Sequence, residues 1–458
     1  MDKSKLKNLI FIFLYALFTL IVLLHHEIWA DEAQVWLVVR DLNLFEIIEH
    51  VRTEGHPLLW YFLVLPFSKL NLPIFSMQIL SWLIMSTAAG FFLHKTPFNT
   101  FCKISILCSS AFLYWFSVIS RSYCLIPLLV FVLAWLYKKQ KEHPYLYTIT
   151  LIFLANTHII MFGFCFALLV LFMFENIIKE KNKKAIIPFS LTTISIASIV
   201  VYLFSSRKEN VIVQTFTPDF SINGLLDVYS KVVFNLFGYT NIFVNILLFC
   251  FLMSVIIFLF KKDKKICFVC LTNLIYQGLI FVFIWSILPQ RAFCLLLVCV
   301  FCLWVVCESK TKNIISFSIA LIFLLTIPEG IKLITKDFKY PFSDGKNTAE
   351  FIKKNIPEDA FILSNYPITT TPISAYLPKD KWKFYYKGYD DFYTYTIWNK
   401  PIPLSFTPVP LAEAMKKHET VYVIMSAGAF YEDVKPIYAS KNNILTNQER
   451  FNIYEFGR

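Results

Sequence analysis

The chain has 458 residues, of which 57% are hydrophobic, 18% aromatic and only 16% charged. Because a soluble domain of ordinary composition carries about a quarter charged residues, this composition excludes a typical soluble protein. The formal net charge of +12 does not indicate nucleic-acid binding. The basic residues concentrate in short connectors between apolar blocks, a pattern typical of proteins embedded among anionic membrane lipids.

Apolar blocks suited to crossing a membrane follow one another from the N-terminus to about residue 328. A spanning helix needs roughly 20 apolar residues, and the blocks are continuous rather than alternating, which favours helices over barrel strands. The expected spans are 6–24, 74–94, 102–120, 123–137, 145–160, 161–178, 185–204, 241–260, 266–287, 292–307 and 314–328. We therefore predict a polytopic α-helical membrane protein with about eleven transmembrane helices.

Lysine-rich connectors indicate how the chain is oriented. If the N-terminus is cytoplasmic, the connectors at 95–103, 138–141, 179–184, 261–265 and 310–312 all face the cytoplasm, as the positive-inside rule requires. This orientation holds only if residues 57–72 do not span. That segment is short and carries Lys69, which favours a helix lying in the membrane interface. The predicted location is the plasma (inner) membrane.

This orientation places three parts of the chain on the extracytoplasmic side. They are a first outer loop at 25–72, a second at 205–241, and a tail at 329–458 that follows the transmembrane module 1–328. The tail is predicted to be a small α/β domain, with helices at 347–354 and 411–418 and strands at 360–364, 421–425 and 451–456. The aromatic run 385–398 is compatible with a strand, a sugar-facing loop or an interfacial belt.

The first outer loop contains the most informative motif, the acidic pair Asp31-Glu32 directly after the first span. A carboxylate at a membrane boundary costs free energy unless it has a partner or a task. One interpretation is a general base that accepts a proton from a hydroxyl or amine. The other is a helix cap, with Asp31 capping a helix that starts at Glu32. The two interpretations are compatible with each other.

A second motif, Glu54-Gly55-His56-Pro57-Leu58, follows in the same loop. An acidic pair after the first span, a helix along the membrane surface and a His-Pro-Leu start of the next helix together resemble the GT-C superfamily of glycosyltransferases. The nearest branch contains protein O-mannosyltransferases and lipid A aminoarabinose transferases. The resemblance covers about the first 130 residues, and Leu58 replaces a second proline that many members have.

The resemblance implies a sugar transfer from a polyprenyl-phosphate carrier to an acceptor outside the membrane. Asp31 matches the catalytic carboxylate of the family, and Glu32 would position the acceptor or the base. Glu54 and His56 would line the same cavity, although His56 also suits a structural role at the interface. The sugar, the acceptor (a glycan, a lipid or a protein) and the carrier length stay open.

Two arginines and a tyrosine at expected outer turns are candidates for holding the phosphate of the donor. Arg121 and Tyr123 lie between the third and fourth expected spans, and Arg291 lies before the tenth. The guanidinium fork of arginine matches phosphate oxygens, although an arginine at this depth also suits a contact with lipid headgroups. His158, at another outer turn, is a candidate contact to the substrate, with a structural role as the alternative.

These residues predict displacement at the anomeric carbon with inversion, with no obligatory cofactor and no metal site. No metal site is predicted because a single acidic pair is not a full oxygen cage, although a divalent ion assisted by Glu32 stays open. The alternatives are a non-catalytic or flippase-type component of an envelope polysaccharide assembly system, and a polymerase or ligase of lipid-linked glycans. A transporter should carry ionisable residues at mid-membrane depth, whereas here they lie at the ends of the expected spans.

Overall fold

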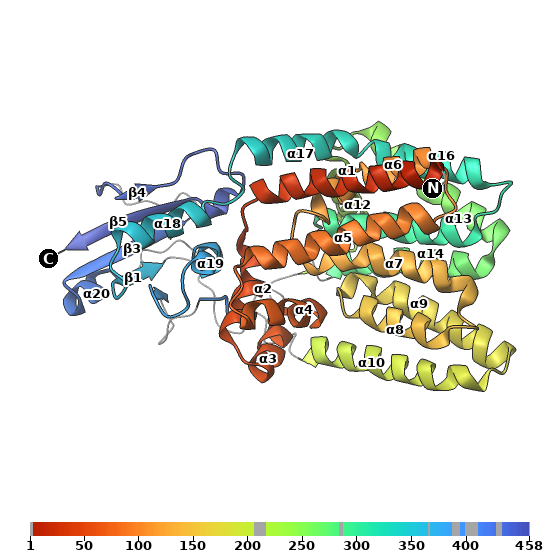
Figure 1. Ribbon diagram of the computed structural model, residues 1–458, viewed down its shortest axis with the longest axis horizontal. Helices are drawn as coiled ribbons and strands as arrows, with labels where there is room; N and C mark the ends of the chain where they lie inside the picture. Colours follow the sequence, from red (N-terminus) through yellow and green to blue (C-terminus); the bar gives the residue numbers. More distant parts are fainter. Residues whose placement is uncertain are drawn as a thin grey trace.

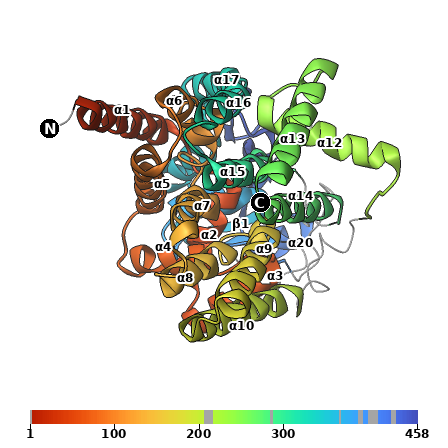
Figure 2. The same ribbon diagram turned by 90° about the vertical axis from the view of Figure 1, so that its right-hand side faces the viewer.

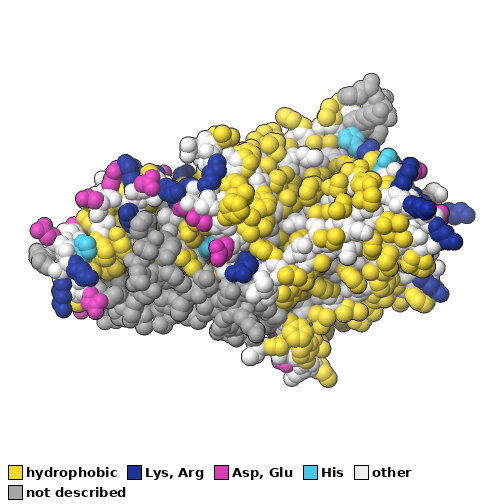
Figure 3. Space-filling model, turned by 90° about the horizontal axis from the view of Figure 1, so that it is seen from below, with side chains coloured by type: hydrophobic (Ala, Val, Ile, Leu, Met, Phe, Trp, Pro, Cys, Tyr) yellow, Lys and Arg dark blue, Asp and Glu magenta, His cyan; other side chains and the backbone are white. Residues whose placement is uncertain are grey.

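The computed structural model describes residues 3–205, 217–283, 287–364, 367–386, 394–398, 411–426 and 433–457. Within these ranges the chain forms a long helical bundle with a small sheet domain at one end (Figure 1). We call this the sheet end. The N-terminus lies at the opposite end, where lysine and arginine side chains gather (Figure 3). We call that the lysine-rich end.

The bundle consists of long apolar helices. Within the described ranges nine helices are long and apolar enough to cross a membrane: Leu6–His25, Phe75–Lys95, Ser122–Lys139, Ile159–Lys179, Lys183–Ser205, Ile242–Lys262, Lys264–Phe283, Pro289–Val306 and Lys312–Lys339. The chain is therefore a polytopic helical membrane protein. The larger count of eleven spans stays a prediction, and part of the expected span 266–287 (residues 284–286) and of the loop 205–241 (residues 206–216) lies outside the described residues.

The bounds of the helices are as follows: α1 (Lys3–His25), α2 (Ala30–Asp41), α3 (Leu44–Glu54), α4 (Leu59–Lys69), α5 (Phe75–Lys95), α6 (Thr100–Leu107), η1 (Ala111–Trp115), η2 (Ser122–Cys124), α7 (Leu125–Leu136), η3 (Tyr137–Lys139), α8 (Pro144–Ala155), η4 (Ile159–Met161), α9 (Phe162–Phe172), η5 (Met173–Lys179), η6 (Lys183–Ala185), α10 (Ile186–Ser205), α12 (Ile222–Phe237), α13 (Ile242–Lys262), α14 (Lys264–Phe283), α15 (Pro289–Val306), α16 (Lys312–Leu324) and α17 (Ile327–Lys339).

Helix α15 runs through the centre of the bundle. Every residue from Gln290 to Val306 is buried, and the end-on view shows α7, α13, α14 and α16 around it (Figure 2). A helix that is apolar on all sides is expected where other helices cover it completely. The first turn of α15 carries Arg291, so this rigid central helix holds that side chain in position.

The expected span 102–120 is divided in the structure. Helix α6 ends at Leu107, and a π-helical turn, η1, follows from Ala111 to Trp115. The hydroxyl of Tyr15 on α1 donates a hydrogen bond to the carbonyl oxygen of Phe112 at 2.7 Å. A side chain that takes a backbone acceptor in this way disturbs the regular helical ladder, here within η1. The hydropathy of the segment does not reveal this break.

Two further segments form helices too short to cross a membrane straight. Helix α8 has 12 residues and stops at Ala155. The side chains of Asn156 and Thr157 donate to the carbonyl oxygens of Ile152 and Leu154 in its last turn, at 3.1 and 2.6 Å. Helix α4 has 11 residues, which agrees with the expectation that residues 57–72 do not span. Helices α2, α3 and α4 lie together at the sheet end (Figure 1).

The sheet domain follows α17 and contains the helices and strands expected for the tail. Its helices are α18 (Gly345–Asn355), α19 (Pro367–Tyr376), α20 (Leu411–Lys417) and η7 (Asn447–Glu449), and its strands are β1 (Phe361–Ser364), β2 (Phe384–Tyr386), β3 (Thr420–Ser426), β4 (Tyr438–Ala439) and β5 (Phe451–Gly457). The strand order is β2-β1-β3-β5-β4. Strands β2, β1 and β3 are parallel, while β5 runs antiparallel to β3 and β4. Of the aromatic run 385–398, residues 387–393 lie outside the described residues.

Candidate functional site

Helix α2 places the acidic pair at the junction between the bundle and the sheet domain. The helix starts at Ala30, and its N-cap is Trp29 in an extended conformation (φ −105°, ψ 177°). Asp31 therefore lies inside the first turn, so the interpretation of Asp31 as the helix cap is wrong. A carboxylate in a first turn is still favoured by the helix dipole, and its side chain is free to face another group.

Asp31 faces Arg121, as the hypothesis of a shared site requires. Oδ2 of Asp31 lies 3.4 Å from Nη1 of Arg121, and the same Nη1 donates a hydrogen bond to the backbone carbonyl oxygen of Asp31. The Asp31 side chain is 42% exposed, whereas that of Arg121 is 12% exposed. Burial alone would lower the pKa of Arg121, but Asp31 raises it above its usual range, so the arginine is held as a cation.

His56 extends this pair on the far side of the guanidinium. Its Nε2 lies 3.4 Å from Nη2 of Arg121. Burial and the charge of Arg121 lower the pKa of His56 to about 4, so the ring is neutral at neutral pH. An arginine has only donors, which makes Nε2 of His56 the acceptor in this contact.

A second arginine belongs to the same cluster. Nε of Arg291 donates to the hydroxyl oxygen of Tyr123 at 2.8 Å, and Nε2 of His158 lies 2.9 Å from that oxygen. Nδ1 of His158 accepts the backbone N–H of Ile160 at 3.1 Å, so a neutral ring donates from Nε2. Burial and the charge of Arg291 lower the pKa of His158 well below its usual range.

The rings of His56 and His158 join the two halves of the cluster. Their centroids are 5.7 Å apart. Asp31, Arg121 and His56 thus meet the trio of Tyr123, His158 and Arg291, although η2, η4 and α15 lie far apart in the sequence. We call these six residues the Asp31–Arg291 cluster. It gathers two permanent cations and one partly exposed carboxylate at the sheet end.

Glu32 points away from this cluster, into a fully buried ion network. Its Oε2 lies 3.1 Å from Nε2 of His26, and Nδ1 of His26 lies 2.9 Å from Oδ2 of Asp337 on α17. These three side chains have no exposed surface. Burial alone would lower the pKa of His26, but Asp337 and Glu32 raise it to about 10. His26 is thus an imidazolium between two carboxylates.

The same network connects to the loop of Arg121. The other oxygen of Glu32, Oε1, accepts the backbone N–H of Ser120 at 2.6 Å, and Tyr114 donates to Asp337 at 2.9 Å. Because Glu32 follows Asp31 and Ser120 precedes Arg121, the bond fixes the two halves of the ion pair relative to each other. Neither His26 nor Asp337 was among the predicted site residues, because Asp337 is 311 positions from His26 and reaches it only through the tertiary fold.

Glu54 is also held in a network of its own. It accepts hydrogen bonds from Gln34 at 2.7 Å and from the Tyr61 hydroxyl, and His50 lies 3.1 Å away. Burial alone would raise the pKa of Glu54, but the bonds from His50 and Gln34 lower it to about 2. The Gln34 amide in turn donates to the backbone carbonyl oxygen of Thr396 at 3.0 Å and accepts its backbone N–H at 2.8 Å. Glu54 therefore ties α2, α3 and α4 to the sheet domain.

The sheet domain holds the start of α2 directly. Oε1 of Glu449 accepts the backbone N–H of Ala30 at 2.9 Å, which satisfies one of the open donors at the helix start. The Tyr376 hydroxyl accepts the N–H of Ile28 at 3.3 Å, and Arg40 donates to two carbonyl oxygens of the α19 region. The domain thus supplies the cap that residue 31 was expected to supply.

The pH dependence of stability should report this contact. Burial raises the pKa of Glu449 to about 8, far above the ordinary value of about 4.3. The folded state therefore binds the proton more tightly, and its contribution to stability is complete below about pH 4 and lost as pH rises through about 8. We expect the thermal unfolding midpoint of wild type to fall over this range, by the equivalent of a few kcal/mol.

Glu449→Gln should flatten that dependence, because the amide keeps the acceptor oxygen and does not ionise. The measurement is thermal unfolding of the solubilised protein between about pH 5 and about pH 9. Glu455→Gln on the exposed face of β5 is the matched control and should keep the wild-type slope. Equal slopes for Glu449→Gln and wild type would contradict the assignment.

Metal ligands do not gather at the site in the part of the chain that the structure describes. No group of three or more His, Cys, Asp or Glu side chains in these ranges is placed to hold a metal ion. The expectation that the reaction needs no metal stays a prediction. Comparisons with known proteins give no match, either to a protein-family model or to a curated protein.

Proposed function

We propose that the protein is a membrane glycosyltransferase of the GT-C type, which moves a sugar from a polyprenyl-phosphate carrier to an acceptor on the side of the sheet domain. The observation that supports this proposal most is the 3.4 Å pair of Asp31 and Arg121 beside a second arginine, Arg291. A partly exposed base and buried cations at one membrane boundary suit the two ends of such a displacement. The resemblance of the first 130 residues agrees with it.

The proposed reaction begins with an exchange of partners. The donor phosphate takes the guanidinium of Arg121 away from Asp31 and also binds near Arg291. An arginine fork suits a phosphate better than it suits a single carboxylate oxygen at this distance. Asp31 then has a carboxylate oxygen available for the hydroxyl or amine of the acceptor.

The chemical step is a direct displacement. The acceptor oxygen or nitrogen forms a bond to the anomeric carbon while the bond from that carbon to the phosphate oxygen breaks. The electron pair leaves with the phosphate, whose negative charge Arg121 and Arg291 stabilise, and the acceptor proton goes to Asp31. Attack opposite to the leaving group inverts the anomeric configuration. Tyr123, His56 and His158 orient the arginines.

The proposal is tested by comparing lipid-linked sugars and envelope glycans by mass spectrometry. Cells of the native host would carry wild type, a deletion, or the deletion complemented with Asp31→Asn. We expect the deletion and Asp31→Asn to accumulate the same lipid-linked sugar and to lack the same modification. If Asp31→Asn restored the modification fully, Asp31 would not be the base. If the deletion left both the lipid-linked sugars and the envelope glycans unchanged, the transferase proposal itself would be wrong.

A further inference from the structure

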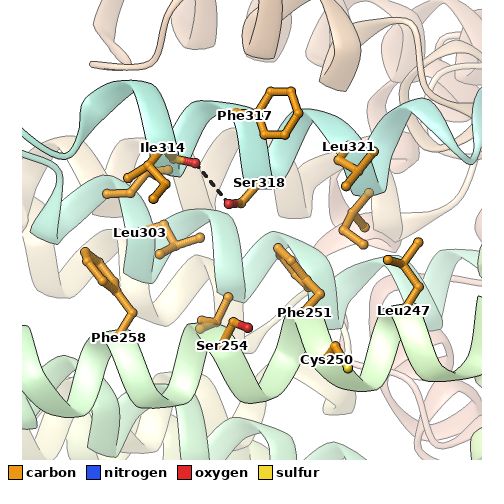
Figure 4. A pocket seen from close by; sticks show the side chains of 13 residues that line it. Leu247, Cys250, Phe251, Ser254, Phe258, Leu303, Ile314, Phe317, Ser318 and Leu321 are labelled. Atoms are coloured by element: carbon orange, nitrogen blue, oxygen red, sulfur yellow. Dashed lines mark hydrogen bonds between the residues drawn. The ribbon is translucent and has the colours of Figure 1, made fainter.

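An apolar groove lies between α13 and α16, and no residue of the Asp31–Arg291 cluster lines it. Helices α13 and α16 form its walls and α15 its floor, and its volume is about 380 Å³. Figure 4 shows the side chains of Phe251, Phe258 and Leu247 on one wall facing Ile314 and Leu321 on the other, with Leu303 between them. All of these residues belong to candidate membrane spans, so the groove faces hydrocarbon.

The groove offers no free hydrogen-bonding group along the α16 wall. The hydroxyl of Ser318 donates to the carbonyl oxygen of Ile314 at 2.9 Å, within its own helix (Figure 4). From Leu247 to Phe258, α13 rises by about 16 Å, which is about half of the ~30 Å hydrocarbon core. The groove therefore has the chemistry and the length of one lipid chain from one leaflet.

Lysines surround the end of the groove at which Phe258 and Ile314 lie. Helix α13 ends at Lys261 and Lys262, and α16 begins at Lys312 after Lys310. Lys262 is paired with Glu308 at 2.7 Å. Within the described ranges, Lys261, Lys310 and Lys312 make no ion pair.

We propose that this groove binds one anionic glycerophospholipid, with an acyl chain between α13 and α16 and the phosphate at Lys310, Lys312 and Lys261. A neutral lipid would fill the apolar part but would leave the cations unpaired, whereas an anionic headgroup gains from each nearby lysine. This site is independent of the proposed transfer reaction. It lies at the lysine-rich end, and the candidate active site lies at the sheet end.

The test uses the purified full chain in lipid nanodiscs and native mass spectrometry after transfer to detergent. Phosphatidylglycerol and phosphatidylcholine with the same acyl chains are the two probes. We expect wild type to retain one phosphatidylglycerol in preference to phosphatidylcholine by about tenfold or more, given three nearby lysines. Equal retention of the two lipids would overturn the proposal.

Two variants test the contribution of the lysines and that of the apolar groove separately. The double variant Lys310→Gln/Lys312→Gln should reduce the preference about tenfold, and Lys183→Gln/Lys184→Gln, which removes the same charge from an exposed connector, should not. Ser318→Phe should fill the groove and abolish retention. Its control is Thr193→Phe on α10, whose hydroxyl makes the same bond to its own helix, at 2.9 Å.

Three other outcomes would also overturn the proposal. Retention that survives Ser318→Phe would mean that lipid binds the lysines without the groove. Retention that survives the double variant would mean that the lysines do not select the headgroup. Displacement of phosphatidylglycerol by an equal amount of a long-chain isoprenyl phosphate would mean that the groove serves an isoprenoid rather than a glycerophospholipid.

Discussion

Replacing Asp31 by Asn should reduce sugar transfer by at least about a hundredfold, because a positioned general base typically contributes 10²- to 10⁴-fold to a rate. The amide has almost the same shape as the carboxylate but accepts no proton from the acceptor. Arg121 keeps its bond to the backbone carbonyl of residue 31, so the guanidinium should stay in place. The measurement is the rate of transfer in membranes supplied with the donor that the mass-spectrometric comparison identifies.

Stability separates a catalytic effect of Asp31→Asn from a folding defect. The Asp31 side chain is 42% exposed, and in the variant the buried Arg121 keeps its hydrogen bond to the backbone carbonyl oxygen of residue 31. The unfolding midpoint of the variant should therefore stay near that of wild type. Glu49→Gln, an exposed carboxylate on α3, is the matched control and should retain full activity. Near-normal transfer by Asp31→Asn would remove Asp31 from the role of base.

Replacing His26 by Leu should destabilise the protein by about 3–5 kcal/mol, the usual cost of leaving buried charges without their partner. The change removes the cation between Glu32 and Asp337, and none of these side chains has exposed surface. The measurement is thermal unfolding of the purified protein at neutral pH. The neighbouring change His25→Leu, at an exposed position, should shift the midpoint little.

A triple variant tests whether the loss of stability comes from the charges left unpaired in the buried network. Adding Glu32→Gln and Asp337→Asn to His26→Leu removes the buried charges together, and replacing a whole buried network is often close to neutral. We expect the triple variant to recover much of the stability that the single variant loses. Equal losses of stability for His26→Leu and His25→Leu would contradict the assignment of charged side chains to this network.

The proximity of Asp31 and Arg121 was predictable from the sequence, because the order of the expected spans puts both residues on the same side of the membrane. Each lies where the chain leaves an apolar block on the same side, and a helical bundle brings such ends together. The short helix α4 and the main strands of the tail were also predictable, because hydropathy and β-branched runs indicate them locally.

Other features depend on contacts that no local pattern contains. The carbonyl oxygen of Phe112 within η1 accepts a hydroxyl from α1, and the start of α2 is held by Glu449 rather than by Asp31. Glu32 was expected beside the substrate, but its bonds to His26 and Ser120 are formed within the buried network. The bond of Glu32 to His26 spans only six positions, but the others join residues dozens to hundreds of positions apart, so composition and periodicity do not reveal them.

The bond between Ala30 and Glu449 also bears on how the protein is made. These residues are 419 positions apart, and Asp337 likewise reaches back to the first membrane exit. During synthesis the early acidic helix therefore emerges long before the groups that hold it have been translated. Until Glu449 has been made, the first N–H of α2 lacks this acceptor, so the native start of the helix is completed only after the sheet domain has been synthesised.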